Sequence, residues 1–500
     1  MNLLLIIFLF IVFSFIPVIF PKLYKPCIIV SIFIVVSSYF FISKNFFHPE
    51  GFSPSREIKA YDFLWNHYNF IVDALKNHRL SLIVPEYDKP IPENIEIYRT
   101  YASEYLSKDW SFSALWDMSV YKGKLYLYFG ITPVLLFYLP FNLVTGMYLS
   151  DNILCFVLSC FIFMLSLFLI KKLTDCSSTY SPIRMLTIFL VGFCNLIPFI
   201  LIRTSIYETA ILSATFLLLS SFVVLYFYLK TKKSILVLML GILLSLCVGA
   251  RPFYVLFIPV VFFMICRINY SNKKDIKCIA KQAILFLIPC IIIGTGLALY
   301  NYLRFDSIFE FGFKYVLNYE NHYEQIPTIK DSLIAIKYAL FNLPAIDGNT
   351  FFSLAETKGH IFANGNITGV LWSFPLFLSF ILLPKFLKDV FIKYKNIFYI
   401  SILMIFCICL NLFITGFIGS VTRYQFEYLV LITILSIIVF CFYFNKINDR
   451  MLKNFLCAIF IMIFIWSMFM NSSLLLCKEN FMHGDSSRNG YITQIKDFLF

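Results

Sequence analysis

Long apolar stretches without a single charge constrain this chain more than any other feature of its sequence. Three of them are Leu3–Phe20, Pro26–Ile42 and Ile397–Leu412. Each is close to the roughly 20 apolar residues that cross about 30 Å of hydrocarbon as a helix. The composition agrees, since 14% of the 500 residues are charged, against about 25% in an ordinary soluble domain. The sequence therefore predicts an all-α integral membrane protein.

The apolar stretches together predict about twelve transmembrane helices. They begin near Leu3, Pro26, Asn152, Arg184, Tyr207, Ser234, Pro252, Gln282, Ile367, Ile397, Tyr424 and Asn454. Residues 126–148 are also apolar, but they contain two glycines and two prolines, which suit a broken, re-entrant or interfacial helix pair better than a clean span. We therefore expect this segment to stay on the outer surface. A clean crossing would also move every later basic cluster to the wrong side.

Basic residues fall in short clusters between the apolar stretches. The clusters are Lys22 and Lys25; Lys171, Lys172 and Arg184; Lys230, Lys232 and Lys233; Arg267 to Lys281; Lys385 to Lys395; and Lys446 to Lys453. This is the positive-inside pattern of cytoplasmic connections, and it accounts for the net charge of +13. No basic stripe follows a soluble face, so we expect no nucleic-acid partner.

Acidic residues gather on the opposite side. Residues 44–151 and 301–366 hold 19 of the 28 Asp and Glu residues, and all six histidines are predicted to be outside as well. The predicted organisation is a transmembrane hairpin (1–43), a first outer loop with juxtamembrane helices (44–151), transmembrane helices (152–300), a second outer loop (301–366), transmembrane helices (367–476) and a polar outer tail (477–500). The first stretch lacks the basic leader and cleavage site of a signal peptide, so we expect it to be a retained helix.

Cysteine usage argues against a disulfide or metal framework. The 14 cysteines are scattered through the spans and their flanks, and neither long outer loop contains one. No zinc-ligand spacing is present in the sequence. We therefore expect no cofactor and no structural metal, and an optional divalent cation stays open.

The first outer loop carries two segments with candidate chemistry. Residues 61–76 have helical apolar periodicity, and we expect this amphipathic helix to lie along the membrane surface. Asp62 and Asp73 would be about 16 Å apart on it, so at most one of them is catalytic. Residues 115–133 then combine Asp117 with tyrosines and lysines, as in a polar site at the membrane boundary or in ordinary headgroup anchoring.

Six segments resemble bacterial multispanning proteins of the C-type glycosyltransferase superfamily, the relatives of dolichyl- and polyprenyl-phosphate-sugar transferases. They are YNFIVDALKNHRLSL (68–82), WDMSVYKGKLYLYFGITPVLLFYLPFNLVTG (116–146), SIYETAIL (205–212), VGARP (248–252), YNYLRFDSIFEFG (300–312) and VTRYQFEYLVL (421–431). The resemblance covers roughly residues 55–440 in order. The chain departs from better-known members in its hairpin before the first outer loop and in Arg304-Phe-Asp306, where similar proteins often carry glycine.

The resemblance implies transfer of a sugar from a polyprenyl phosphate to a hydroxyl acceptor on the outer face of a bacterial cytoplasmic membrane. Such a reaction needs a carboxylate general base and cationic groups for the departing phosphate. The candidate bases, in order of preference, are Asp73, Asp117 and Glu208. The candidate substrate-binding residues are Tyr121, Lys124, Arg203, Arg251, Asn301, Arg304 and Arg423. The implied partners are membrane lipids, the lipid-linked donor and an envelope acceptor.

Each candidate has an alternative interpretation. A single Arg in a short outer link also anchors lipid headgroups, and Glu208 and Glu427 near span ends could simply pair with a neighbouring Arg. A transporter or flippase of a lipid-linked or anionic substrate would also use Arg at helix ends, but it usually places charges near the midplane, where this sequence is almost uncharged. A non-catalytic envelope scaffold is the third class.

Overall fold

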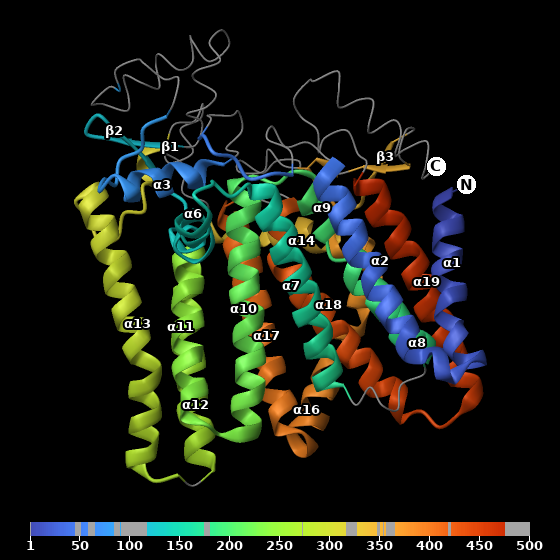
Figure 1. The fold of residues 1–500 in the computed structure, drawn as a ribbon. Helices are drawn as coiled ribbons and strands as arrows, with labels where there is room; N and C mark the ends of the chain where they lie inside the picture. Colours follow the sequence, from blue (N-terminus) through green and yellow to red (C-terminus); the bar gives the residue numbers. More distant parts are fainter. Residues whose placement is uncertain are drawn as a thin grey trace. The chain divides into compact units, whose positions relative to one another are not determined.

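The computed structural model describes most of the chain. The described residues are 2–45, 52–58, 66–84, 91, 118–174, 181–272, 274–316, 328–347, 351–353, 355–356, 366–418 and 422–475. Within them, nine helices are long and apolar enough to cross a membrane, and shorter apolar helices accompany them (Figure 1). The chain is an all-α, multi-pass integral membrane protein, as its sequence predicts.

The chain forms two compact units. Unit 1 contains Met1–Phe47, Ser159–Arg203 and Pro327–Phe500, and unit 2 contains His48–Leu158 and Thr204–Ile326. Helix α7 (Asp151–Leu173) begins in unit 2 and ends in unit 1. Each unit is described separately below.

Unit 2 is built on a row of apolar helices with a small polar assembly at one end. Its elements are α3 (His67–Lys76), β1 (Met118–Tyr121), β2 (Lys124–Leu127), η3 (Val134–Tyr138), α6 (Leu139–Thr145), α10 (Ile206–Thr231), α11 (Ser234–Ala250), η4 (Pro252–Leu256), α12 (Phe257–Ser271), α13 (Ile276–Phe305) and η5 (Phe313–Tyr315). Helix α11 packs against both α10 and α13. Gly241 permits the close approach, because a Cβ there would lie 2.4 Å from the carbonyl oxygen of Phe286 in α13.

The two ends of unit 2 carry different elements. The β1–β2 hairpin and α3 lie at one end, while the α10–α11 and α12–α13 connections lie at the other (Figure 1). Lys230 lies in the last turn of α10, Lys232 and Lys233 lie in the first of these connections, and Lys274 lies in the second. The positive-inside rule predicts that the hairpin end faces away from the cytoplasm, and we name it the outer end on that prediction.

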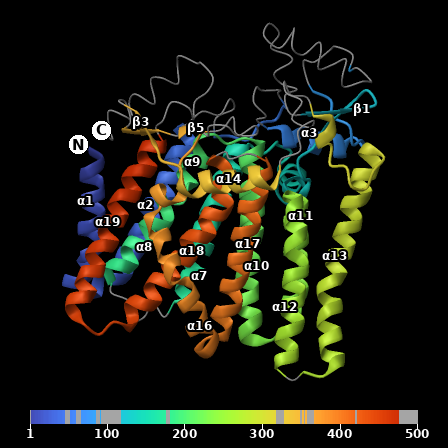
Figure 2. The same ribbon diagram turned by 180° about the vertical axis from the view of Figure 1, so that it is seen from behind.

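Unit 1 contains the remaining helices and two more short hairpins. Its elements are α1 (Asn2–Ile19), η1 (Pro21–Leu23), α2 (Tyr24–Asn45), α8 (Ser181–Phe193), α9 (Ile197–Ile202), α14 (Ile329–Phe341), β3 (Ala345–Asp347), β4 (Phe351–Ser353), β5 (Ala355–Glu356), β6 (Asn366–Ile367), α15 (Val370–Ser373), η6 (Pro375–Leu382), α16 (Leu383–Lys393), α17 (Lys395–Ile418), α18 (Thr422–Lys446) and α19 (Arg450–Leu475). Figure 2 shows α14, α17 and α18 from behind. Helices α1 and α2 pack on α8, where the Tyr39 hydroxyl donates to the Gly192 carbonyl at 2.6 Å.

One predicted span departs from a continuous helix. The apolar stretch that begins near Ile367 folds as α15, the 3₁₀-helix η6 and then α16. Pro375 and Pro384 stand at the two breaks, since proline lacks an N–H and clashes with the preceding turn. The residue before the first break, Phe374, has the non-helical angles φ −145° and ψ 72°.

The glycine- and proline-rich segment 126–148 does not form a clean span. Its first residues belong to strand β2, so the expected pair of helices is wrong for this half. Its second half is helical over the five residues of η3 and the seven of α6. At 1.5 Å per residue this helix is about 18 Å long, which is too short for about 30 Å of hydrocarbon.

Candidate functional site

Segments of four sequence motifs come together at the outer end of unit 2. Gly130 lies against the end of α11, where a Cβ would be 2.1 Å from the carbonyl oxygen of Gly249. The same contact is reciprocal, because a Cβ on Gly249 would lie 2.3 Å from Oγ1 of Thr132. The YFGIT and VGARP segments therefore touch through backbone, which explains why both carry glycine there.

The other motifs join the same junction. The ring of Phe129 meets the ring of Tyr207, in the SIYETAIL segment, edge-on at 5.1 Å. The guanidinium of Arg304, in the YNYLRFD segment, donates to the carbonyl oxygen of Leu127 at 2.7 Å. Strand β2 and the residues after it thus contact three helices of unit 2, α10, α11 and α13.

The Arg304 side chain is buried and makes its hydrogen bonds within the protein. Its side chain is 3% exposed, and its guanidinium also donates to Oδ1 of Asn301 at 3.0 Å. Its charge lies over the ring of Tyr300, 3.8 Å from the centroid. Arg304 and Asn301 were both predicted to bind substrate. Arg304 instead binds Asn301 and the end of β2, so these contacts favour a structural role for both residues.

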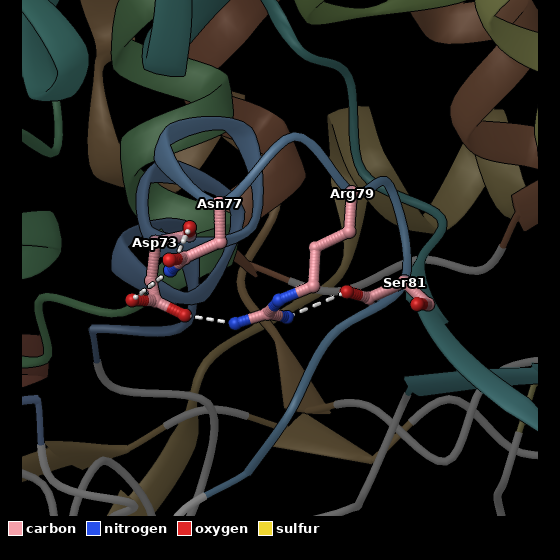
Figure 3. A network of polar contacts seen from close by, with 4 residues as sticks. All are labelled: Asp73, Asn77, Arg79 and Ser81. Carbon is pink, nitrogen blue, oxygen red and sulfur yellow. Dashed lines mark hydrogen bonds and ion pairs between the residues drawn. The ribbon is translucent and has the colours of Figure 1, made fainter.

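Helix α3 carries the preferred candidate base. Asp73 forms an ion pair with Arg79, and Asn77 donates to Oδ1 of Asp73 at 3.0 Å (Figure 3). The second arm of the Arg79 guanidinium donates to the carbonyl oxygen of Ser81 at 2.7 Å. The Asp73 side chain is 28% exposed, so its carboxylate is both held in place and accessible.

The helix itself is more enclosed than predicted. Residues 61–65 lie outside the described residues, and α3 begins at His67. Its buried residues are His67, Tyr68, Asn69, Phe70, Ile71, Val72 and Ala74. The helix therefore packs into unit 2, largely against η3, and exposes its C-terminal part. The prediction of a helix lying on the membrane surface is wrong for its first two turns, because protein covers them.

The β1–β2 hairpin is fastened to the start of the second outer loop. Lys122 and Gly123 have positive φ angles of 48° and 67°, as a tight two-residue turn requires. Asp306 accepts hydrogen bonds from the Tyr121 hydroxyl at 3.0 Å and from the Lys122 ammonium at 2.5 Å. The Lys122 bond lowers the pKa of Asp306, and the Asp306 bond raises the pKa of Tyr121. We call these three side chains the hairpin latch.

The remaining predicted residues lie in different places. Lys124 is exposed at the first position of β2. Glu208 is 3% exposed in the first turn of α10 and accepts a hydrogen bond from Ser205, an arrangement that also suits a helix start. Arg203 and Arg423 belong to unit 1. Asp117 lies outside the described residues.

Arg251 is the cation of the VGARP segment. It ends α11 in an extended conformation, and its guanidinium is 5.4 Å from the ring centroid of Phe253. Burial raises the pKa of Tyr68 in α3, the charge of Asp151 raises it further, and the charge of Arg251 lowers it.

Two residues of this region were missed by sequence reasoning. Arg79 is six residues from Asp73, a spacing that a helix would not bring together, and the turn after α3 does so. Asp151 is fully buried at the start of α7, where an ionisable residue at the edge of an apolar span was the available signal. Among the described residues, no group of three or more His, Cys, Asp or Glu side chains could hold a metal ion.

Comparison with family models and with curated proteins gives no match. Among solved structures, the chain is similar to the apo form of an oligosaccharyltransferase from Archaeoglobus fulgidus, with 11% sequence identity and a TM-score of 0.46. The alignment covers 95% of this chain and 60% of the oligosaccharyltransferase. The chemistry of the site therefore follows from its own residues and their contacts.

Proposed function

We propose that the protein is a membrane glycosyltransferase that moves a sugar from a polyprenyl-phosphate donor to a hydroxyl of an envelope glycan, lipid or protein. The reaction takes place on the outer face of the cytoplasmic membrane. The observation that carries the proposal is the junction of motif segments at the outer end of unit 2, together with the held and accessible Asp73 carboxylate on α3, which packs against η3 just after the junction. These segments are the ones through which the sequence resembles the C-type superfamily.

Asp73 is the proposed general base. The acceptor oxygen attacks the anomeric carbon of the sugar while its proton passes to the Asp73 carboxylate. The bond from the anomeric carbon to the phosphate oxygen breaks, and the lipid phosphate leaves with that electron pair. Arg79 and Asn77 fix the carboxylate, which limits the geometries that the acceptor can adopt.

The departing phosphate needs a cation, and Arg251 is the proposed one. It directly follows Gly249 and Ala250, whose carbonyl oxygens lie against Gly130, so it stands at the junction of motif segments. An arginine fork matches phosphate oxygens in a bidentate manner, as a lysine does not. Lys124, exposed on β2, is a second cation at this end of the unit.

The test is transfer of radiolabelled sugar from a panel of polyprenyl-phosphate sugars by the purified protein in lipid, with an envelope extract as acceptor. Asp73→Asn should lower the rate by about 10² to 10⁴-fold, the usual contribution of a general base. Asp117→Asn is run beside it as the rival base. Asp389→Asn is the matched control, because Asp389 forms an exposed ion pair with Lys446 in unit 1.

Three outcomes of this test would change the assignment. If Asp117→Asn alone abolishes transfer, Asp117 replaces Asp73 as the base. If both folded variants match wild type, neither carboxylate is the base. If wild type transfers no label from any donor of the panel, the glycosyltransferase proposal fails in favour of transport or a scaffold.

A further inference from the structure

A buried carboxylate ties the start of α3 to the start of α7. Asp151 is fully buried, and its Oδ2 accepts a hydrogen bond from the backbone N–H of Asn66 at 2.8 Å. Its Oδ1 accepts a second bond from the Tyr138 hydroxyl of η3. In return, the backbone N–H of Asp151 donates to Oδ1 of Asn66 at 3.2 Å. Residues 85 positions apart thus hold each other by two reciprocal bonds.

The contacts converge on the residue that precedes α3. Asn66 has a φ of 61°, in the left-handed region that asparagine tolerates better than most residues and that still needs support from its surroundings. A second tether follows three residues later, where the Asn69 side chain donates to the Leu149 carbonyl at 2.9 Å. The ring centroids of Tyr68 in α3 and Tyr138 in η3 lie 5.4 Å apart, so the two elements also pack through these rings.

A buried charge is costly unless its hydrogen bonds are met, so its presence here calls for a reason. Asp151 stands in the first turn of α7, where the helix dipole favours a negative charge. Burial, reinforced by the charge of Asp151, raises the pKa of Tyr138, and its hydroxyl therefore remains a donor across ordinary pH. The Asp151 carboxylate thus accepts hydrogen bonds from two fixed donors, the Asn66 backbone N–H and the Tyr138 hydroxyl.

We propose that Asp151 is a positioning residue for Asp73. It fixes the entry of α3, and thereby the place of the carboxylate two turns further along this helix of ten residues. A helix this short is marginal by itself, so the anchors at its first turn decide where its last turn lies. The inference rests on the proposed function, since it assigns Asp73 as the group that must be placed.

The first test is a double-mutant cycle in the transfer assay. Asp151→Asn and, separately, Tyr138→Phe should lower kcat by on the order of 10 to 10²-fold with donor KM within about two-fold, because misplacement of a reacting group by 1 Å costs about that much. In the Asp73→Asn background the same changes should lower the residual rate no further. A general loss of folded protein would lower the rate in both backgrounds by the same factor and would overturn the inference.

The second test does not depend on transfer. Amide hydrogen exchange of residues 67–76 should be faster in Asp151→Asn and in Tyr138→Phe than in wild type, while exchange in α18 is unchanged. Asp389→Asn, at an ion pair of unit 1, serves as the control and should leave α3 as in wild type. Unchanged exchange of α3 in both variants would refute the anchoring itself. Faster exchange in a protein whose wild type transfers no sugar would keep the anchor and reject the proposed function.

Discussion

Units 1 and 2 use polar groups in contrasting ways. In unit 2, the described outer end relies on charged side chains: Asp73 with Arg79, and Lys122 with Asp306. In unit 1, several of the described bonds from side chains to the backbone of other elements come from neutral side chains. They are Gln425 to Ala339 and Thr368, Asn342 to Ile367, Trp372 to Phe341, Trp466 to Trp372, and Asn471 to Ser373.

The two kinds of polar group suit different roles, one in chemistry and the other in supporting the backbone. Amide and indole donors satisfy backbone carbonyls where loops and broken helices leave them open, and they carry no charge into the membrane. The Asp73–Arg79 pair of unit 2 remains partly accessible, with Asp73 at 28% and Arg79 at 21% exposure. These charged groups of unit 2 can take a proton or bind an anion, whereas these neutral groups of unit 1 hold backbone in place. Four predictions test this contrast, from the largest expected effect to the smallest.

The ion pairs of the two units should differ in their effect on transfer. Arg79→Gln removes the partner that fixes the Asp73 carboxylate, and we expect the transfer rate to fall by about 10 to 10²-fold in a folded protein. Lys446→Gln removes the partner of Asp389 in unit 1 and should leave the rate within about two-fold, as exposed ion pairs contribute little. Equal effects of the two changes on the initial rate would break the contrast.

Substitution of two glycines at close backbone contacts should distinguish an effect on stability alone from an effect on both stability and transfer. Gly130→Ala in unit 2 places a Cβ 2.1 Å from the Gly249 carbonyl, and Gly416→Ala in unit 1 places one 2.2 Å from Oγ of Ser332. Each should cost about 1–3 kcal/mol, read as a lower Tm in lipid nanodiscs. Per folded molecule, only Gly130→Ala should also slow transfer.

The matched control for both glycines is in α13. Gly294→Ala meets no atom within 4 Å, so it should keep or slightly raise the Tm. A transfer rate for Gly416→Ala below that of Gly130→Ala would contradict the division of roles between the units.

The neutral bonds of unit 1 should matter for stability alone. Gln425→Met keeps the length of the side chain but removes its bonds to the carbonyl oxygens of Ala339 at 3.2 Å and Thr368 at 2.7 Å. We expect a loss of about 1 kcal/mol, typical of polar contacts in membrane proteins, measured as a shift in thermal unfolding. Transfer per folded molecule should stay at the wild-type level, and a change in KM for the donor would count against this assignment.

The smallest effect is expected at the hairpin latch. Asp306→Asn weakens the bond to Lys122, so trypsin should cleave after Lys122 and Lys124 a few-fold faster at neutral pH. Asp389→Asn should leave this cleavage unchanged. Cleavage at the wild-type rate in Asp306→Asn would show that the hairpin latch does not hold the hairpin.

The latch also has a pH dependence with a definite sign. The Lys122 hydrogen bond lowers the pKa of Asp306 below its ordinary value. The latch is therefore stabilising above the unfolded pKa, about 3.9, and it is lost as the pH falls through the lower pKa of the folded protein. Hairpin amide exchange, normalised to the unfolded peptide, should stay constant from neutral pH to about pH 5 and rise only well below it.

The sequence by itself determined the class of protein, and it predicts the side on which the charges lie. Apolar length and the spacing of Lys and Arg are local properties, and hydrocarbon thickness and the positive-inside rule act on them directly. Local chemistry also predicted a broken helix before Gly146, but it marked neither the breaks at Pro375 and Pro384 nor the pairing of residues 124–127 as a strand.

Only the tertiary structure decided which charged groups are accessible and which are internal. Arg304 and Arg251 look alike in sequence, each near the end of an apolar span, yet Arg304 donates to Leu127, 177 residues away. Asp151 looked like a loop residue, and its partner Asn66 is 85 residues distant. Hydrogen bonds over such separations depend on how helices pack, and no local pattern of residues encodes that packing.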